Sequence, residues 1–422
     1  MKLRLTEKKR ILVKNTAMMY ILTFSTYLMQ FLVVPYETRI LHTDKYGLLN
    51  LVKAVMVYFN LLIDFGFHLS ATEQISLHRE DKHKVSEIFT AVTLNKLMIA
   101  AGGAAVLGCL CGIIPRWGQN ALFFFIFYAA TVTNSLIPDY LYRGVERMGV
   151  ITVRVVSVKL FFTSMIFLLL HEPEDYYVEA WLTLIGNSAA LLGTLIHLFR
   201  KMDVHFVRCS PGRLWRNLRQ SLVFFISGIA STLYTSASTI ILDFLSAGAA
   251  TAYFAGAEKI VVTAQNGFSP VADSLYPYMT RNRDFRLIRK VLLIMEPIVI
   301  AGCAVVFIFA RPLCMWFFGA EYAPMAPVLR AMLPMIALIL PNYLLSFPTL
   351  SAMGLTRYAA ISVFFGTGVH LFNLAVFYFT GNLNMVTLAA LSTVAEAMIL
   401  LFRLVVIWRN RDKLKTGGGD EA

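Results

Sequence analysis

Apolar runs of about twenty residues recur along the whole chain and alternate with short polar connections. A helix needs about 20 consecutive apolar residues to cross the hydrocarbon core of a bilayer. On this criterion the pattern predicts about twelve transmembrane helices and an all-α polytopic membrane protein. The predicted spans are residues 15–36, 47–68, 88–109, 120–141, 151–170, 178–199, 219–242, 252–278, 291–310, 328–350, 359–379 and 385–407.

The predicted spans fall into two groups of six, separated by a basic segment. Lys53 in the second span has a counterpart in Lys259, in the second span of the second group, and Tyr46 and Tyr253 precede them at nearly equal distance. Two such halves in the same orientation predict a pseudo-two-fold axis along the membrane normal, with a substrate site between the repeats. The expected parts are an N-terminal six-helix bundle (1–199), a basic cytoplasmic linker (200–218), a C-terminal six-helix bundle (219–410) and a flexible cytoplasmic tail (411–422).

The composition is that of a membrane protein. Of the 422 residues, 58% are hydrophobic and 15% are charged, and the mean hydropathy is +0.65, whereas soluble domains carry about 25% charged residues. The net charge of +13 does not indicate a nucleic-acid partner, because 29 of the 38 basic residues lie in connections on one side of the predicted membrane and 4 lie on the other. The positive-inside rule therefore predicts that both termini are cytoplasmic.

Arg154, Arg219 and Arg403, at the cytoplasmic ends of their predicted spans, are counted with the connections. The remaining five basic residues lie deeper inside predicted spans, where a charge facing lipid costs about 2.5–3.5 kcal/mol. Lys96 and Lys159 are close enough to the cytoplasmic ends of their spans for their ammonium groups to snorkel to the headgroups, which is the outcome we expect. Lys53 and Lys259 lie two turns in from the opposite, less basic side, and we expect them to face a hydrated interior. The fifth is Arg330.

Two spans carry a polar stripe at helical spacing. Lys259 and Asn266 lie on one face of the eighth span, and Asn50, Lys53 and Asp64 lie on one face of the second. Such stripes should face the protein interior or a hydrated cavity, because ionisable groups are costly in lipid.

Four carboxylates lie in or near the predicted spans, namely Asp64, Glu258, Glu296 and Glu396. Each could bind a coupling proton or cation, or pair with a nearby base, and the sequence leaves both readings open. His370, alone in its span, is expected to hydrogen-bond a neighbouring helix. The acidic segment 171–179 reads as a solvated outward turn.

The connections contain no catalytic motif, so we expect a protein that is not an enzyme and needs no cofactor. The five cysteines show neither metal-ligand nor disulfide-framework spacing. Prolines interrupt several spans, Pro138 and Pro348 among them, and kinks or breaks there would suit helices that bend between two states.

Several stretches together resemble the Wzx-type polysaccharide flippases of the multidrug/oligosaccharidyl-lipid/polysaccharide superfamily. The elements AEKI, SPxxxxLYP and FGxxY occur in this order. The matching stretches are IDFGFHLSATEQISLHREDKHKVSEIF (63–89), IPDYLYRGVERM (137–148), YFAGAEKI with SPVADSLYPY (253–278) and FFGAEYAPMAPVLRAM (317–332).

This resemblance implies a MATE-like fold of two six-helix bundles around a central cavity, alternating between inward-open and outward-open states in a bacterial inner membrane. It implies as substrate an undecaprenyl-pyrophosphate-linked oligosaccharide, such as an O-antigen repeat unit, moved from the cytoplasmic to the periplasmic leaflet with H⁺ or Na⁺ as a possible coupling ion. Other polysaccharide-assembly membrane proteins are possible partners. The cationic lumen that it implies would be formed by Lys53, Lys259 and Arg330, with Asn50 and Asn266 as further substrate-binding candidates.

Two alternatives stay open. A multidrug cation antiporter of the same superfamily would be favoured if Asp64, Glu258 and Glu396 faced the lumen in place of the lysines. A membrane enzyme of polysaccharide assembly would be expected to carry a larger periplasmic loop than any that this sequence contains.

Overall fold

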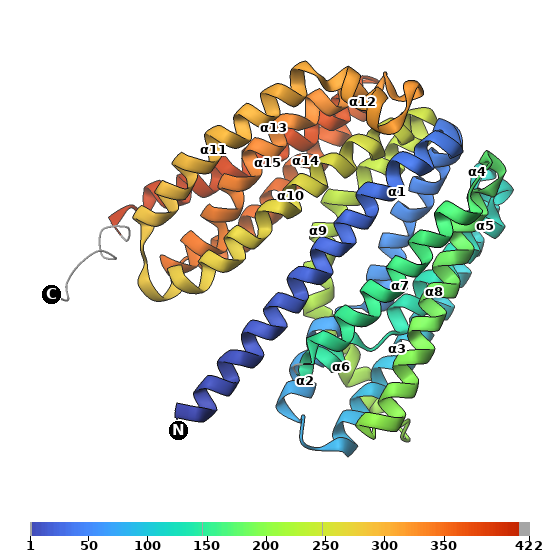
Figure 1. Ribbon diagram of the computed structural model, residues 1–422, viewed down its shortest axis with the longest axis vertical. Helices are drawn as coiled ribbons and strands as arrows, with labels where there is room; N and C mark the ends of the chain where they lie inside the picture. The colour runs from blue at the N-terminus through green and yellow to red at the C-terminus, as the bar shows by residue number, and fades with distance from the viewer. Residues whose placement is uncertain (1, 146, 247, 413–422) are drawn as a thin grey trace. The chain divides into compact units, whose positions relative to one another are not determined.

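The computed structural model describes residues 2–145, 147–246 and 248–412, with only the backbone described at 2–17, at 230–237 and at scattered positions elsewhere. Throughout these residues the regular secondary structure is helical, without a strand (Figure 1). The prediction of an all-α membrane protein is confirmed. Most of the predicted tail, residues 413–422, lies outside the described residues.

The predicted membrane spans have clear counterparts. Nine described segments are long and apolar enough to cross a bilayer, and the first of them, Ile21–Leu77, joins the first two predicted spans. The seventh and eighth predicted spans correspond to α9 (Pro211–Ser246, 36 residues) and α10 (Ala249–Asn282, 34 residues). Counting the two parts of Ile21–Leu77 separately and adding α9 and α10 accounts for all twelve predicted spans.

The chain groups into two compact units. Unit 1 comprises Met1–His42 and Val52–Ile229, and unit 2 comprises Thr43–Leu51 and Ala230–Ala422. The helices that begin in unit 1 are α1 (Lys2–Asp64), α2 (Phe67–Leu77), α3 (Lys82–Ile113), α4 (Pro115–Gln119), α5 (Ala121–Leu136), α6 (Asp139–Gly144), α7 (Met148–Leu169), η1 (Pro173–Asp175), α8 (Tyr176–His197), η2 (Leu198–Met202) and α9.

The helix α1 contains a sharp turn between the first two predicted spans. His42 has φ 53° and ψ 177°, a conformation that residues other than glycine rarely adopt. The two parts of α1 on either side of His42 therefore count as separate spans. The turn also coincides with the boundary between residues of unit 1 and unit 2.

Proline explains two of the breaks inside predicted spans. The fourth span is interrupted at Pro138, where α5 ends and α6 begins, because the residue before a proline is disfavoured in the helical region. In the tenth span, Pro348 lies in the π-helical turn η4 (Leu345–Ser351), in which Ser346 has ψ −122°. These breaks are confirmed as predicted. Pro297, Pro334 and Pro341, which the sequence also marked as interruptions, lie inside continuous helices, so the prediction is wrong at these positions.

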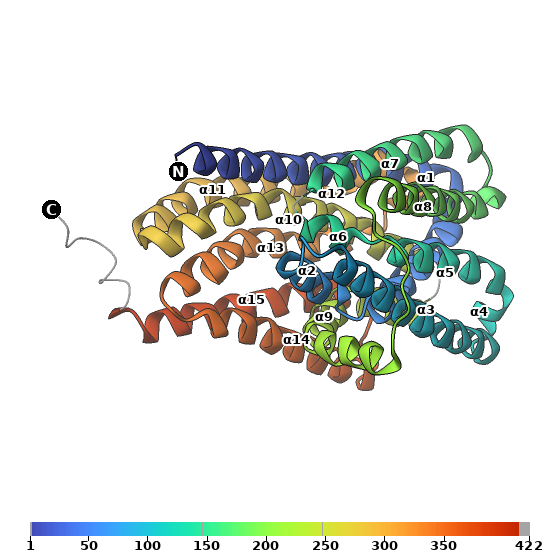
Figure 2. The ribbon, with the colours of Figure 1, turned by 90° about the horizontal axis from the view of Figure 1, so that it is seen from below.

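In unit 2 the helix α13 lies at the centre, because it packs against α10, α11, α12 and α15. Figures 1 and 2 show α10, α13 and α15 running side by side. The elements after α10 are α11 (Phe285–Ile308), α12 (Ala310–Phe318), η3 (Ala320–Tyr322), α13 (Met325–Leu344), η4, α14 (Thr356–Phe379) and α15 (Met385–Arg409).

In unit 1, α5 and α7 both pack on α8, and α2 packs on α6. A core cluster joins α2, α3, α6 and the segment after α8, with Phe67, Phe89 and Tyr142 fully buried. This cluster supports the end of unit 1 where the α2–α3, α6–α7 and α8–α9 connections meet.

Candidate functional site

Lys259 is held by an aromatic ring. Its Nζ donates a hydrogen bond to the hydroxyl of Tyr46 at 2.9 Å and lies 5.0 Å from the centre of the same ring. Both residues belong to unit 2, and Tyr46 is fully buried. No carboxylate oxygen of the described residues lies within ion-pair distance of this ammonium group, so its positive charge is stabilised mainly by a neutral aromatic partner, an interaction worth about 0.5–2 kcal/mol.

Tyr46 and Tyr253, which occupy equivalent positions in the two halves of the sequence, both contact the ring of Tyr322. Tyr46 and Tyr253 each meet Tyr322 edge to face, with ring centres 6.2 and 5.6 Å apart. Tyr322 also stacks on Phe318 at 5.4 Å, and Gly319 between them has φ 113°, which favours glycine. The FGxxY element therefore builds the aromatic wall that supports the partner of Lys259.

Lys53, the counterpart of Lys259 in unit 1, forms an ion pair with Glu179 of α8. The Lys53 side chain is 34% exposed, whereas that of Glu179 is 11% exposed. The second carboxylate oxygen of Glu179 is buried and has no hydrogen-bond partner among the described residues. The prediction that 171–179 is a solvated turn is wrong at this residue, because the turn ends at η1 and Glu179 is a buried helical residue.

Asp64 and Lys96 form a buried polar network in unit 1. The ammonium group of Lys96 donates to Asp64 at 2.8 Å and to the carbonyl oxygen of Ser135 at 2.7 Å. The Ser135 hydroxyl in turn donates to Asn60 at 2.7 Å. The expectation that Lys96 snorkels is wrong, since its side chain is 4% exposed. The Asp64 carboxylate and the Ser135 carbonyl oxygen accept the hydrogen bonds of this ammonium group, which snorkelling would have directed to the lipid headgroups.

Unit 2 has an internal network of its own around Asn342 of α13. The side-chain amide of Asn342 donates to the carboxylate of Glu396 at 2.7 Å, and the backbone carbonyl oxygen of Asn342 accepts from Arg403 at 2.6 Å. Arg403 also donates to Ser362 at 2.9 Å and is 5% exposed. Counting Arg403 with the cytoplasmic bases was therefore wrong. Its spacing of seven residues from Glu396, two turns along one helix face, was a signal that could have revealed it.

Arg154 was also counted among the connections, although it lies inside α7. Its guanidinium contacts both carboxylate oxygens of Asp139 at 2.7 and 3.0 Å and donates to Thr194 at 3.2 Å. Both contacts to Asp139 come from the single Nη2 atom, so they form one bifurcated, charge-assisted contact. It gives the conspicuous segment IPDYLYRGVERM a structural role, in which α6 is tied to α7.

The other predicted substrate-binding residues make local contacts. Arg330 donates to the carbonyl oxygen of Phe307 at 2.9 Å, with its guanidinium 5.4 Å from the Phe307 ring centre. Asn50 and Asn266 each donate a side-chain hydrogen bond of 2.7 Å to the carbonyl oxygen four residues earlier. These amides are already satisfied by their own helices. Asn50 and Lys259 both donate to Tyr46, whereas the described hydrogen bonds of Arg330 and Asn266 involve neither Tyr46 nor Lys259.

Two predicted ion-coupling carboxylates have few partners. Glu258 of α10 accepts a long 3.4 Å hydrogen bond from Thr239 of α9. Glu296 of α11 has a buried carboxylate oxygen that finds no hydrogen-bond partner among the described residues. Among the four candidate carboxylates, these two make the weakest described contacts.

His370 of α14 is fully buried and makes a 3.3 Å hydrogen bond with Ser238 of α9. The prediction that this histidine bonds a neighbouring helix is confirmed. Lys159 donates to Thr26 at 3.3 Å. Pro270 and Asp273 continue, at helical spacing, the face of α10 that carries Lys259 and Asn266. Their side chains lie outside the described residues.

Long apolar helices, with ion pairs and polar networks buried between them, define an all-α polytopic membrane fold. The chain belongs to the polysaccharide biosynthesis protein family, whose model matches residues 12–283. It is 25% identical over 399 residues to a protein of Shigella dysenteriae named "Putative O-antigen transporter", covering 93% of this chain and 99% of that protein. An Escherichia coli (strain K12) protein of the same name is 25% identical over 281 residues, covering 67% of this chain and 68% of that protein.

Solved structures give the same fold at low sequence identity. A lipid II flippase, MurJ, in an inward closed conformation superposes with a TM-score of 0.67 at 11% identity, covering 96% of this chain and 90% of that one. An inward-facing multidrug resistance MATE family transporter of the MOP superfamily also superposes with a TM-score of 0.67, at 13% identity, covering 92% of this chain and 95% of that one. The predicted MATE-like fold is confirmed.

Proposed function

We propose that this protein is a flippase that moves undecaprenyl-pyrophosphate-linked oligosaccharide repeat units from the cytoplasmic to the periplasmic leaflet of a bacterial inner membrane. Membership of the polysaccharide biosynthesis family and similarity to proteins named as O-antigen transporters support the substrate class. The likeness to MurJ supports a fold able to carry a lipid-linked sugar. The proposal includes cytoplasmic termini, six-helix bundles at 1–199 and 219–410 joined by the linker 200–218, and alternating access without enzymatic chemistry.

The observation that carries this proposal is the environment of Lys259. An ammonium group inside a membrane span is costly unless a partner compensates its charge. The partner of Lys259 is the hydroxyl and ring of Tyr46, and no described carboxylate lies within 4 Å of its ammonium group. A pyrophosphate would supply the missing negative charge and accept charge-assisted hydrogen bonds.

Lys53 enters the proposal as the second cation, with Glu179 as its resident counterion. A pyrophosphate would compete with Glu179 for this ammonium group. Protonation of Glu179 would favour the exchange, because it removes the charge that Lys53 neutralises. Asn50, Asn266 and Arg330 stay secondary candidates, since their described contacts lie within or beside their own helices.

Ion coupling is the least constrained part of the proposal. Among the four candidate carboxylates, Glu296 is favoured as the site for a proton or cation, because one of its buried oxygens has no described partner. Asp64 and Glu396 are engaged by Lys96 and Asn342. These contacts also disfavour the multidrug cation antiporter, which would need such acids to be available to a cationic drug.

The test is complementation of a deletion in the native host, with the lipid-linked oligosaccharide followed by radiolabel. Wild-type protein should relieve the accumulation of complete repeat units on the lipid carrier and restore surface polysaccharide. Lys259→Ala and Lys53→Ala should each impair export at unchanged levels of folded protein. Lys84→Ala, which removes an exposed lysine beside Asp81, is the matched control and should export normally.

Two outcomes would contradict the proposal. Full export by the double variant Lys53→Ala/Lys259→Ala would remove both lysines from the substrate site. Normal surface polysaccharide in the deletion strain, together with altered resistance to cationic drugs, would favour the antiporter.

A further inference from the structure

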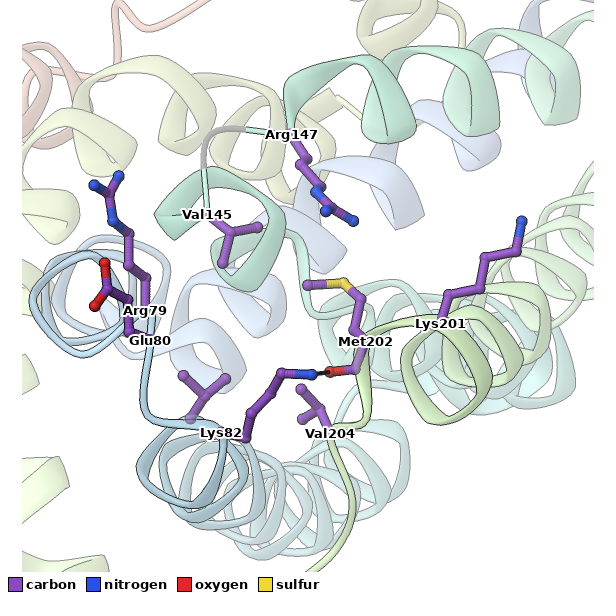
Figure 3. Close-up of a pocket in the computed structure, with 9 residues that line it drawn as sticks. Arg79, Glu80, Lys82, Val145, Arg147, Lys201, Met202 and Val204 are labelled. Atoms are coloured by element: carbon purple, nitrogen blue, oxygen red, sulfur yellow. Dashed lines mark hydrogen bonds between the residues drawn. The ribbon is translucent and has the colours of Figure 1, made fainter.

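Unit 1 contains a pocket of about 370 Å³ that none of the predicted site residues lines (Figure 3). It lies where three connections meet, at the end of the unit that the positive-inside rule predicts to be cytoplasmic. Arg79 comes from the α2–α3 turn and Lys82 is the first residue of α3, while Arg147 comes from the α6–α7 connection and Lys201 from η2. Two of the segments that carry the family resemblance, 63–89 and 137–148, therefore contribute to a single pocket.

The floor of the pocket is part of the rigid core of unit 1. Val85 and Val204 are 3% and 1% exposed and belong to the core cluster of α2, α3 and α6. Lys82 donates to the carbonyl oxygen of Met202 at 2.8 Å, which ties the start of α3 to η2 across the pocket (Figure 3).

The far wall is fixed by the segment that leaves η2. The backbone N–H of His205 donates to the Ser86 hydroxyl at 3.2 Å, and that of Val207 donates to the Thr90 hydroxyl at 3.1 Å. This segment is therefore bonded along the first turns of α3. The pocket is a built feature of unit 1, because both of its sides are held by specific hydrogen bonds.

The charge of the pocket is strongly unbalanced. Four basic residues line it, and Glu80 is the one acidic residue among the lining residues. In the part of the chain that the structure describes, the side chains of Arg147 and Lys201 form no hydrogen bond or ion pair, and both are exposed. Guanidinium and ammonium groups arranged around one opening are the usual recognition elements for phosphate oxygens.

We propose that this pocket binds the phosphate headgroup of an anionic lipid at the cytoplasmic face. Arg147 and Lys201 supply charge-assisted hydrogen bonds, and Lys82 adds positive charge beside its bond to Met202. The volume falls in the range of small-ligand sites and leaves room for more than an inorganic anion. Two lipids share this chemistry, the substrate carrier and an anionic phospholipid.

Assignment to the substrate carrier rests on the proposed function and makes the pocket a first docking site before transport. Binding at the pocket itself does not depend on transport. A protein that binds but does not translocate would contradict the proposed function alone, and one that translocates but does not bind would contradict this site alone.

The experiment measures binding of inorganic pyrophosphate by isothermal titration calorimetry to the full-length protein in phosphatidylcholine nanodiscs. We expect saturable binding that weakens at least about tenfold in Arg147→Gln/Lys201→Gln, since hydrogen bonds to charged groups are lost. The matched control Arg216→Gln/Arg219→Gln removes two exposed bases of α9 that do not line the pocket. It should bind as the wild type does.

Absence of binding to the wild type, or an equal loss in both double variants, would overturn the site. All three proteins must elute as one folded species in size-exclusion chromatography, which the exposure of the four bases favours. Two further arms identify the source of the phosphate. Competition by farnesyl pyrophosphate would support the substrate carrier, and suppression of pyrophosphate binding by phosphatidylglycerol in the nanodiscs would support a phospholipid.

Discussion

The buried pair of Asp64 and Lys96 provides a direct test of which charges this protein keeps in its interior. The perturbation is a double-mutant cycle with Asp64→Asn, Lys96→Met and the combined variant. Asp64→Asn leaves an ammonium group that is 4% exposed without its carboxylate. Lys96→Met leaves Asp64, which is 28% exposed and still reaches water, and removes the donor to the Ser135 carbonyl oxygen.

The expected magnitudes follow from this difference in burial. Breaking a buried ion pair costs about 3–5 kcal/mol. We expect Asp64→Asn to lower the free energy of unfolding by about 3 kcal/mol, the lower end of this range, because Asp64 is partly exposed. Lys96→Met should cost about 2 kcal/mol, the penalty of one unsatisfied acceptor and one carboxylate that water partly solvates. The combined variant contains neither charge, so its cost should fall below the sum by about 2 kcal/mol.

The assay is reversible unfolding in mixed micelles by titration with sodium dodecyl sulfate, followed by circular dichroism. The exposed pair Lys84–Asp81, with Nζ and the carboxylate 3.7 Å apart, is the control and should show no measurable coupling. If Lys96→Met is neutral and the coupling lies within about 0.5 kcal/mol of zero, Lys96 is solvated by headgroups and its placement in a buried network is refuted.

Three further predictions concern other carboxylates and bases. Glu296→Gln should remove the dependence of translocation on an imposed pH gradient in proteoliposomes, because it removes the half-buried carboxylate proposed to bind the coupling ion; retained dependence would exclude this residue. Arg403→Met should lower the free energy of unfolding by about 1–3 kcal/mol, because the buried acceptors of Asn342 and Ser362 lose their donor. Arg409→Met, exposed on the same helix, should change it little, and equal effects would contradict the network around Asn342. The backbone N–H of Lys84 donates to the Asp81 carboxylate and lowers the pKa of Asp81 below its usual 3.8. The stabilisation of the folded protein by this contact is therefore complete above pH 3.8 and is lost as the pH falls through the lowered pKa. Asp81→Asn keeps the cap without the charge and should flatten the loss of unfolding midpoint below about pH 4; an unchanged acid profile would disprove this.

Much of the fold could be predicted because the signals are local. Twenty apolar residues in a row predict a span wherever they occur, and Pro138 and Pro348 predicted breaks because a proline constrains its own neighbours. The importance of Lys259 followed in the same way, since a lysine within an apolar run is conspicuous without knowledge of its surroundings. The substrate-binding and ion-coupling roles assigned to these residues remain predictions.

The pairing of charges could not be predicted in this way. Snorkelling was a sound expectation for Lys96 from its distance to the end of the span. In the structure, however, Asp64, 32 residues earlier, compensates the charge of Lys96 inside the protein. Arg403 was counted with the cytoplasmic bases because it stands near other arginines at the end of the chain. In the structure it faces Asn342, 61 residues earlier.

The sequence by itself determined that this is a helical membrane protein, where its spans lie and which family it resembles, and it indicated the breaks near Pro138 and Pro348. These properties depend on the length of hydrophobic runs, the stereochemistry of proline and the order of residues, all of which are local features of the sequence. Only the tertiary structure decided that Lys53 meets Glu179, that Tyr46 and Tyr253 meet Tyr322, and that the basic connections of unit 1 line one pocket. Such contacts join residues from distant helices, and the net energy of a buried charge depends on the partner that packing brings to it.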